Sequence, residues 1–310
     1  MVTPYARHVL VNVWNADARE LAGFVAPGVD LVITSPPYNV GLPYSAHDDN
    51  MPQAEYWALL AAVWDACYQV MAPGARVAVV GPYGVGRDPW RPWAAPVGET
   101  LAAAGFVRAG DVIWDKGTTG NRCAWGSFRR PSAPCLRDRT EVVIIARKPG
   151  RLAVPRDVYI LNEKGNYLVS PWLTSHDFCV LSQNLWTIPP ESAKRIKHPA
   201  PFPLDLAARL IRFYAWPGAR VLDPFAGAGT VGMAARDLGC GADLVEIDAG
   251  YCDLTARRLE GAQNGRNWQT NKGLDAGATA RGRGAADRAH RARRSRKGEN
   301  RGEDVIPLAG

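Results

Sequence analysis

Residues 34–39 read Thr-Ser-Pro-Pro-Tyr-Asn, a combination of side chains that can activate an aromatic amine. Two consecutive prolines have a fixed φ angle and no N–H, so the carbonyl groups around them are held outward and stay out of a sheet. The Ser35 hydroxyl and the Pro36 carbonyl can then accept hydrogen bonds from an –NH₂ group, while Tyr38 stacks on the ring that carries it. Such bonds pull the nitrogen toward tetrahedral geometry and free its delocalised lone pair. A plain Pro-Pro turn after a strand is the alternative interpretation.

A second loop has the spacing of a site for an adenosine-containing cofactor. Gly227, Gly229 and Gly232 form a G-x-G-x-x-G pattern between an expected strand and an expected helix. Glycines let the backbone approach a ligand, and a helix N-terminus offers free N–H groups. Glu246 ends the next strand about 20 residues further on, where a carboxylate accepts hydrogen bonds from both ribose hydroxyls. The pattern does not say which cofactor, and a strand–turn–helix with incidental glycines is the alternative.

Strands and helices that must position these loops alternate along the chain. Strands are expected at 29–33, 76–80, 106–114, 140–147, 219–223 and 242–247, and helices at 53–72, 96–104, 204–215, 230–238 and 250–260. Pro73-Gly74 is expected to end the first of these helices. The alternation predicts an α/β fold with a doubly wound, mostly parallel sheet. Ligands bind such sheets in a crevice at the carboxyl ends of the strands, which is where both loops belong.

The composition is that of a globular protein with a sizeable core. The chain has 310 residues, of which 47% are hydrophobic and 22% charged, which excludes a collagen, a coiled coil and wholesale disorder. No apolar run approaches the roughly 20 residues of a membrane helix, and the N-terminus MVTPYARHVL lacks the apolar core of a signal peptide. A cytoplasmic protein with no membrane partner is therefore expected. The six cysteines form no C-x-x-C pair and the five histidines are isolated, so no metal site is expected and the histidines are expected to be structural or surface groups.

Three segments carry no regular pattern. Residues 115–138 form a long loop rich in Gly, Pro and Arg, and residues 150–190 are also irregular. Residues 266–310 form a basic tail that is rich in Arg and Gly and poor in large apolar side chains, so we expect it to be disordered. The tail is either a polyanion-binding arm or a solubilising extension.

In this order, the motifs resemble those of the DNA amino-methyltransferases, which transfer a methyl group from S-adenosylmethionine to cytosine N4 or adenine N6. The resemblance covers most of residues 8–262 and is carried by DARELAGFVAPGVDLVITSPPYN, WDKG, RTEVVIIARK, HPAPFPLDLAARLI, VLDPFAGAGT and EIDAGYCDLTARRL. Because the catalytic loop precedes the cofactor loop, the chain is similar to their β group. The resemblance implies a Rossmann-like S-adenosylmethionine-dependent methyltransferase fold with a circularly permuted motif order, within a catalytic domain at 1–265.

Carried over by position, the resemblance also implies a set of site residues. The catalytic loop would comprise Ser35, Pro36, Pro37 and Tyr38. The residues that would bind S-adenosyl-L-methionine are Asp17, His198, Pro203, Asp223, Pro224, Phe225, Gly227, Gly229, Thr230 and Glu246. Asp17 would face the adenine amino group, Glu246 would hold the ribose, and residues 198–203 would close the pocket. Ala16 stands where the family usually has a glycine before this acid.

The implied partner is double-stranded DNA, whose target base must be flipped out of the duplex to reach Tyr38. Basic residues expected to contact phosphates are Lys116, Arg122, Arg129, Arg130, Arg137, Lys194, Arg195 and Lys197. A solvated charged face is the alternative. The segment 115–138 would then be a DNA-facing loop and 150–190 a target-recognition insert. A cognate restriction endonuclease is a further possible partner, and the chain is expected to be a monomer or a homodimer.

The base that would be methylated depends on one residue of the catalytic loop. The family tends to use Ser-Pro-Pro-Tyr for cytosine N4 and Asp-Pro-Pro-Tyr for adenine N6, so Ser35 favours cytosine N4 and adenine N6 is the alternative. The other interpretations of the chain are an RNA methyltransferase, a nicotinamide or flavin oxidoreductase suggested by the glycine pattern alone, and an inactive nucleic-acid-binding module.

Overall fold

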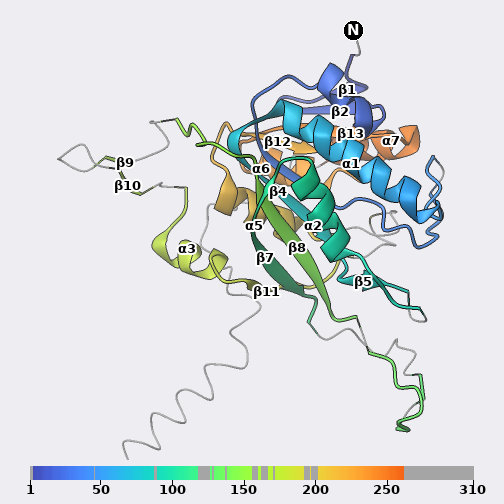
Figure 1. Ribbon diagram of the computed structural model, residues 1–310. Helices are drawn as coiled ribbons and strands as arrows, with labels where there is room; N and C mark the ends of the chain where they lie inside the picture. Colours follow the sequence, from blue (N-terminus) through green and yellow to red (C-terminus); the bar gives the residue numbers. More distant parts are fainter. Residues whose placement is uncertain are drawn as a thin grey trace, which may run out of the picture. The chain divides into compact units, whose positions relative to one another are not determined.

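A nine-stranded sheet in the order β1-β2-β13-β12-β3-β4-β8-β7-β11 runs through the described residues (Figure 1). The computed structural model describes residues 3–261 except 45, 87–88, 118–125, 128, 137, 156–159, 162–166, 170–171, 192–195 and 197–201; the predicted basic tail at 266–310 lies outside this range. In sheet order, the strands are Ala6–Arg7, Val11–Asn15, Gly241–Glu246, Arg220–Asp223, Val29–Thr34, Met71–Gly81, Thr140–Arg147, Val107–Asp115 and Leu185–Thr187. The strands from β2 to β4 are parallel, as are β7 and β11, whereas β8 is antiparallel to both of its neighbours.

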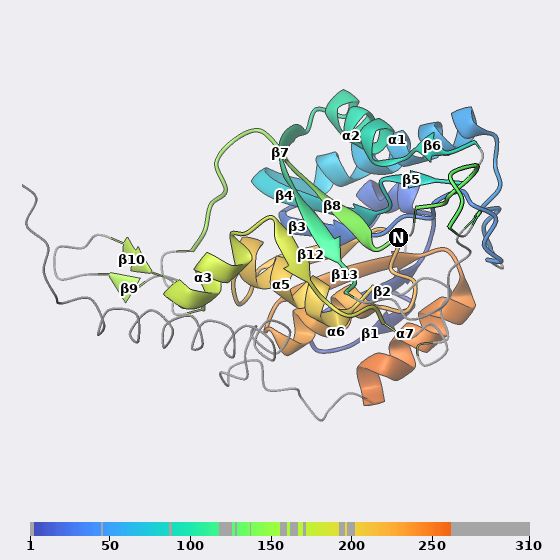
Figure 2. The same cartoon turned by 90° about the horizontal axis from the view of Figure 1, so that it is seen from below.

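Helices cover both faces of the sheet, as a doubly wound fold requires (Figure 2). One face carries the 3-10 helix η1 (Ala18–Gly23) with α1 (Gln53–Val70) and α2 (Ala94–Ala103), and the other carries α5 (Leu204–Tyr214), α6 (Thr230–Asp237) and α7 (Ala249–Gly261). Two short hairpins, β5–β6 (Gly84–Val85, Arg91–Pro92) and β9–β10 (Ile160–Leu161, Tyr167–Val169), and helix α3 (Ser175–Leu181) complete the described elements. The predicted fold class is confirmed.

The core of the sheet is built by the strand and helix patterns that the sequence predicts. The apolar run of β3, with Leu31, Val32 and Ile33, is fully buried because helices cover both of its faces. On α1, residues such as Leu60 and Trp64 recur on one face and pack against the sheet. Burial of these side chains holds β3 next to β4 in the sheet. The position of the residues that follow β3 is therefore set by the core.

The boundary between α1 and β4 differs from the prediction. The helix ends at Val70, and the strand that follows already begins at Met71, so Pro73 and Gly74 lie inside β4 instead of ending the helix. The pairing with β3 shifts there, since Val29 pairs with Met71 but Leu31 pairs with Arg76. Gly74 adopts φ +81°, a left-handed conformation that glycine tolerates, and its N–H donates to the Lys148 carbonyl. The two residues therefore form an irregularity in a strand.

The prediction that segment 150–190 is irregular is wrong for its second half. Helix α3 lies there, and β11 pairs in parallel with β7 at the edge of the central sheet. Trp186 of β11 is 1% exposed and belongs to the core. Three residues of strand give too short an apolar pattern to be read from sequence, because their burial depends on β7, which lies about 70 residues earlier in the chain.

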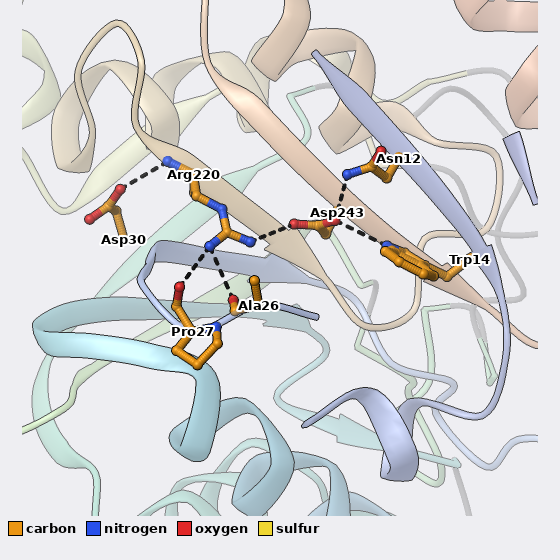
Figure 3. A network of polar contacts seen from close by, with 7 residues as sticks. All are labelled: Asn12, Trp14, Ala26, Pro27, Asp30, Arg220 and Asp243. Atoms are coloured by element: carbon orange, nitrogen blue, oxygen red, sulfur yellow. Dashed lines mark hydrogen bonds and ion pairs between the residues drawn. The ribbon is translucent and has the colours of Figure 1, made fainter. Parts of the chain in front are cut away.

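A polar network ties the amino ends of four strands together (Figure 3). Arg220 of β12 donates to Asp243 of β13 at 3.0 Å, and its backbone N–H donates to Asp30 of β3 at 2.9 Å. The same Asp243 accepts from Asn12 and Trp14 of β2, each at 3.0 Å. The carbonyls of Ala26 and Pro27 accept from Nη1, the other terminal nitrogen of the Arg220 guanidinium. This network sets the register of the four strands whose opposite ends carry the glycine loop, Glu246 and the Ser-Pro-Pro-Tyr loop.

None of the helices in the described ranges combines the length and the apolar character needed to span a bilayer.

Candidate active site

The two loops singled out in the sequence begin side by side. Strands β3 and β12 are parallel neighbours, with Val221 paired to Leu31 and Leu222 paired to Val32. The Ser-Pro-Pro-Tyr loop follows β3 and the glycine loop follows β12 at the same carboxyl edge of the sheet. The structure therefore brings together two motifs that lie almost 190 residues apart in the chain.

Aromatic residues pack against the Ser-Pro-Pro-Tyr loop and hydrogen-bond to it. The Ser35 and Tyr38 hydroxyl oxygens lie 2.9 Å apart, within hydrogen-bond distance. The Tyr38 ring packs edge-on against Trp93, with centroids 5.3 Å apart. The Tyr56 hydroxyl donates to the Pro37 carbonyl at 2.8 Å and accepts from the Trp93 indole at 2.7 Å. These contacts hold the loop in place. Among the described residues, none donates a hydrogen bond to the Pro36 carbonyl.

The phenol of Tyr38 stays protonated at neutral pH. Burial, followed by the negative charge of Glu141, raises its pKa well above the ordinary value for tyrosine. A protonated phenol can donate to the Ser35 oxygen, and that oxygen keeps a second lone pair for another donor.

A buried carboxylate that the sequence analysis missed holds the chain just after Tyr38. Asp49 is 2% exposed and accepts backbone hydrogen bonds from Asn39, Val40 and Leu42 at 2.8–3.1 Å. Asn39 has φ +57°, and its side chain bonds both the N–H and the carbonyl of Met51. An acid ten residues beyond a motif has no spacing signal, so nothing in the sequence indicates that it folds back on the loop.

Two positions of the glycine loop require glycine, and the second also lacks room for a side chain. Gly227 and Gly229 adopt φ +49° and +72°, in the left-handed region. A Cβ on Gly229 would also lie 2.4 Å from the methyl carbon of Thr255, whose hydroxyl donates to the Gly227 carbonyl. Asp223 is 1% exposed and accepts from the Phe225 N–H at 3.1 Å, so it shapes the turn from inside.

Glu246 is held in place by the backbone on either side of it. One carboxylate oxygen accepts from the Gly227 N–H at 2.8 Å and the other from the Asp248 N–H at 2.9 Å. Burial raises its pKa above the usual value for a glutamate. Each carboxylate oxygen has a further lone pair, so the side chain can still accept two hydrogen bonds from a ligand diol.

A pocket of about 290 Å³ lies between the two loops. The predicted site residues that line it are Asp17, Ser35, Pro37, Pro224, Phe225, Gly227 and Glu246. The predicted residues that do not line it are Pro36, Tyr38, Pro203, Asp223, Gly229 and Thr230, and His198 lies outside the described residues. Pro203 precedes α5 as its N-terminal cap residue, while Gly229 and Thr230 begin α6.

Asp17 stands on the pocket wall as the N-cap of η1. Its carboxylate accepts from the Arg19 N–H at 2.9 Å and forms an ion pair with the Arg19 guanidinium at 2.5 Å. The hydrogen bonds from Arg19 lower the pKa of Asp17, so this carboxylate is ionised at neutral pH. The side chain is a hydrogen-bond acceptor for any donor that enters the pocket.

Among the wall residues that were not found from the sequence, two have unusual surroundings. His47, which the sequence analysis treats as structural or surface, lines the pocket, and its Nε2 atom is buried with no hydrogen-bond partner among the described residues. Ile247 also lines the pocket and is 49% exposed, although it is a large apolar side chain. An orphan polar atom and an exposed apolar wall are features that a bound molecule with a flat ring and hydroxyl groups would satisfy.

The basic residues predicted to contact DNA have different surroundings. Arg129 and Arg130 are exposed in the turn that follows Ser127. Lys116 is instead paired with Glu141 and is only 19% exposed. The other five, Arg122, Arg137, Lys194, Arg195 and Lys197, lie outside the described residues. Among the residues that the structure does describe, no group of three His, Cys, Asp or Glu is arranged to hold a metal ion.

The titration of Asp223 should be visible in protein stability. Burial raises its pKa to about 7, against about 4 in an unfolded chain. Between about pH 4 and 7 the folded protein therefore holds a proton that the unfolded chain has lost, and stability falls as pH rises. Asn at this position cannot titrate. The Tm of Asp223→Asn minus that of the parent should increase by roughly 3 °C or more from about pH 5 to 7.5, and a pH-independent difference would contradict the burial argument.

Comparisons with known proteins agree with this geometry. Residues 29–257 match the model of the N6_N4_Mtase family, described as DNA methylase. The curated type II methyltransferase M.MjaVI of Methanocaldococcus jannaschii is 28% identical over 168 residues, which cover 54% of this chain and 80% of that protein. M.HpaI of Haemophilus parainfluenzae, also a type II methyltransferase, is 24% identical over 248 residues, 76% of this chain and 70% of that protein.

Solved structures share the fold. The protein TTHA0409 of Thermus thermophilus, solved in complex with S-adenosyl-L-methionine, is 29% identical with a TM-score of 0.61, over 80% of this chain and 92% of that one. The cytosine-N4-specific PvuII DNA methyltransferase is 19% identical with a TM-score of 0.60, over 83% and 88% of the two chains, a likeness of fold alone.

Proposed function

The chain belongs to the N6_N4 DNA methylase family, and from this premise we propose that it methylates the exocyclic amine N4 of a flipped cytosine in DNA. The family makes it a DNA amino-methyltransferase that uses S-adenosylmethionine; the base and the role of each residue are the proposal. One observation carries those roles: Ser35 and Pro37 of the catalytic loop, Gly227 of the glycine loop and Glu246 at the end of β13 line the same pocket.

The pocket fits S-adenosylmethionine, which supplies the methyl group when bound. Glu246 would accept hydrogen bonds from the ribose hydroxyls. Each of its carboxylate oxygens is held by one backbone N–H and has a further lone pair for a hydroxyl donor. Ile247 and Phe225 offer apolar surface for the adenine ring, with Asp17 as the acceptor for its amino group. The orphan Nε2 of His47 would gain a polar partner. Residues 198–203 would close the pocket from the other side.

The catalytic loop would act by positioning and by polarising the amine. The Ser35 oxygen and the Pro36 carbonyl would accept the two amine hydrogens, while Tyr38 stacks on the base. The lone pair would then face the methyl donor in the adjacent pocket for an in-line displacement. The contribution of the protein is orientation and preorganised hydrogen bonds, with no covalent enzyme intermediate.

The identity of the methylated nucleoside tests the proposed choice of base. Incubating the protein with double-stranded DNA and labelled S-adenosylmethionine, then digesting to nucleosides, should give N4-methylcytosine. Labelled N6-methyladenine would overturn the choice of base, which rests on Ser35 in place of an aspartate. Label recovered only from RNA of the same sequence, or from neither polymer, would overturn the proposed reaction.

Ile247 offers a direct test of the adenine site. Replacing Ile247 by Asp removes an apolar contact and adds a charge beside the ring, so the dissociation constant for S-adenosylmethionine should rise roughly 10-fold, or about 1.4 kcal/mol. Isothermal titration calorimetry on the free protein measures this value. Ile247→Val is the matched control and should bind nearly as tightly as the parent. Equal affinities for all three proteins would place the adenine elsewhere.

The wider role is also part of the proposal. Relatives named type II methyltransferases support a modification enzyme that protects its target site from a cognate restriction endonuclease. We place the protein in the cytoplasm with its DNA substrate, as a catalytic domain at 1–265 that acts as a monomer or homodimer. Residues 115–138 would face the DNA and 150–190 would read the target. Treated plasmid should resist an endonuclease of the same specificity.

A further inference from the structure

An ion pair lies beside the catalytic loop and has no role in the mechanism described so far. Glu141, the second residue of β8, pairs with Lys116, which follows the end of β7. Their side chains are 15% and 19% exposed, so both charges are largely withdrawn from water. The Lys116 ammonium also lies 5.2 Å from the centre of the Trp114 ring. A lysine so neutralised is poorly suited to bind a phosphate, which leaves the purpose of the pair open.

Strand register puts Glu141 on the face of the sheet that carries Ile33, two residues before Ser35. Ile33 of β3 and Ile145 of β8 both pair with Ala78 of β4, so the two isoleucines point to one face. Glu141 precedes Ile145 by four residues within β8, which keeps it on that face, and Ser35 follows Ile33 by two residues, just past the end of β3. Only β4 separates their strands, a spacing of about 10 Å. Glu141 and the start of the catalytic loop therefore lie at the same edge of the sheet, on either side of β4.

The effect of Glu141 on Tyr38 gives independent support for this placement. Its negative charge is the second-largest cause, after burial, of the raised pKa of the Tyr38 phenol. A carboxylate that acts on the phenol is also close to whatever ring stacks on that phenol. The pair therefore borders the place where the proposed target base would lie.

Methylating an amine creates a proton that must leave. A ring-conjugated amine that has gained a methyl group is cationic and strongly acidic, so a carboxylate is a sufficient base for it. Ser35 stands where an aspartate would supply a carboxylate within the motif itself. Glu246 is engaged by backbone N–H groups on the cofactor side, and Asp223 is buried inside the glycine loop. Glu141 lies on the side of the base.

We propose that Glu141 accepts the proton lost by the target amine and that Lys116 orients its carboxylate. This inference rests on the proposed function. The amine lone pair forms the bond to the methyl carbon as the carbon–sulfur bond breaks and leaves its electron pair on sulfur. One N–H bond then breaks, its electrons return to nitrogen, and the proton passes to the Glu141 carboxylate. Solvent takes up that proton when the methylated DNA leaves.

The test separates chemistry from binding. In Glu141→Gln the side chain keeps its size and can still accept a hydrogen bond from Lys116, but it is not a base. The rate of methyl transfer in a single turnover should fall about 10²-fold. The affinities for DNA and for S-adenosylmethionine should change less than about 2-fold, as should the fluorescence of 2-aminopurine placed next to the target cytosine, which reports base flipping. Glu99→Gln, an exposed site on α2, is the matched control.

Chemical rescue excludes a purely structural role. Formate added to Glu141→Ala should restore part of the lost rate, and it should have no effect on Lys116→Met. A Glu141→Gln rate near that of the parent overturns the inference, as does a loss of DNA affinity or base flipping that matches the loss of rate. If the parent protein itself methylates no DNA, the proposed function fails before any variant is compared.

Discussion

Replacing Tyr38 by Ala should reduce the rate of methyl transfer about 10³-fold while cofactor affinity stays unchanged. The ring does not line the cofactor pocket, so its loss removes no contact from that pocket. It does remove the surface on which the flipped base would stack, and a base without that surface is no longer held in line with the methyl donor. The packing of the ring against Trp93 also ends, which loosens the loop.

A matched variant separates the ring from the hydroxyl. Tyr38→Phe keeps the stacking surface and loses the 2.9 Å hydrogen bond with Ser35, so its rate should fall less than about 10-fold. Single-turnover assays with saturating DNA and cofactor measure all three rates. Should Tyr38→Ala turn over near the parent rate, the stacking role assigned to this residue is wrong.

Replacing Glu246 by Ala should weaken S-adenosylmethionine binding about 10³-fold. Two charge-assisted hydrogen bonds to the ribose hydroxyls would be lost, each worth about 1.5–3 kcal/mol. A total of about 4 kcal/mol corresponds to three orders of magnitude in the dissociation constant. The variant also frees the Gly227 N–H, which lines the same pocket, so the effect combines lost contacts with a less ordered loop.

Calorimetric titration with S-adenosylmethionine gives the affinity directly. Glu246→Gln retains an acceptor oxygen and should fall between the parent and the alanine variant. Glu260→Ala removes an exposed carboxylate from α7 and serves as the control for a general charge effect. Unchanged affinity in Glu246→Ala would remove the ribose assignment.

The parts of the fold and site that follow from local sequence could be predicted. The strand–turn–helix around Gly227 and Gly229 is a local requirement, since both glycines adopt positive φ angles. The Pro36-Pro37 pair likewise fixes its own backbone, and β8 spans Thr140–Arg147 as its apolar run indicates. Glu246 was found because the spacing from a glycine loop to the next strand end is constrained by the length of one helix.

Features that depend on distant packing could not be predicted. Asp49 holds the loop at 39–42 only because the chain folds back on itself there. His47 and Ile247 become pocket wall through their position in space, which no periodicity encodes. Likewise, the pairing of Lys116 with Glu141 depends on the antiparallel register of β7 and β8. The sequence alone predicts that lysine as a phosphate contact, because its partner lies 25 residues away in the chain.

The network around Arg220 has a consequence for synthesis on the ribosome. Its partner Asp30 lies 190 residues earlier in the chain, and the two adjacent strands that carry the loops depend on this contact. A nascent chain that stops short of β12 and β13 leaves β2 and β3 with only one sheet neighbour each. Non-local pairing of this kind slows folding and keeps strand edges open during translation. The amino-terminal strands β2 and β3 thus acquire their final partners only after β12 and β13 have been synthesised.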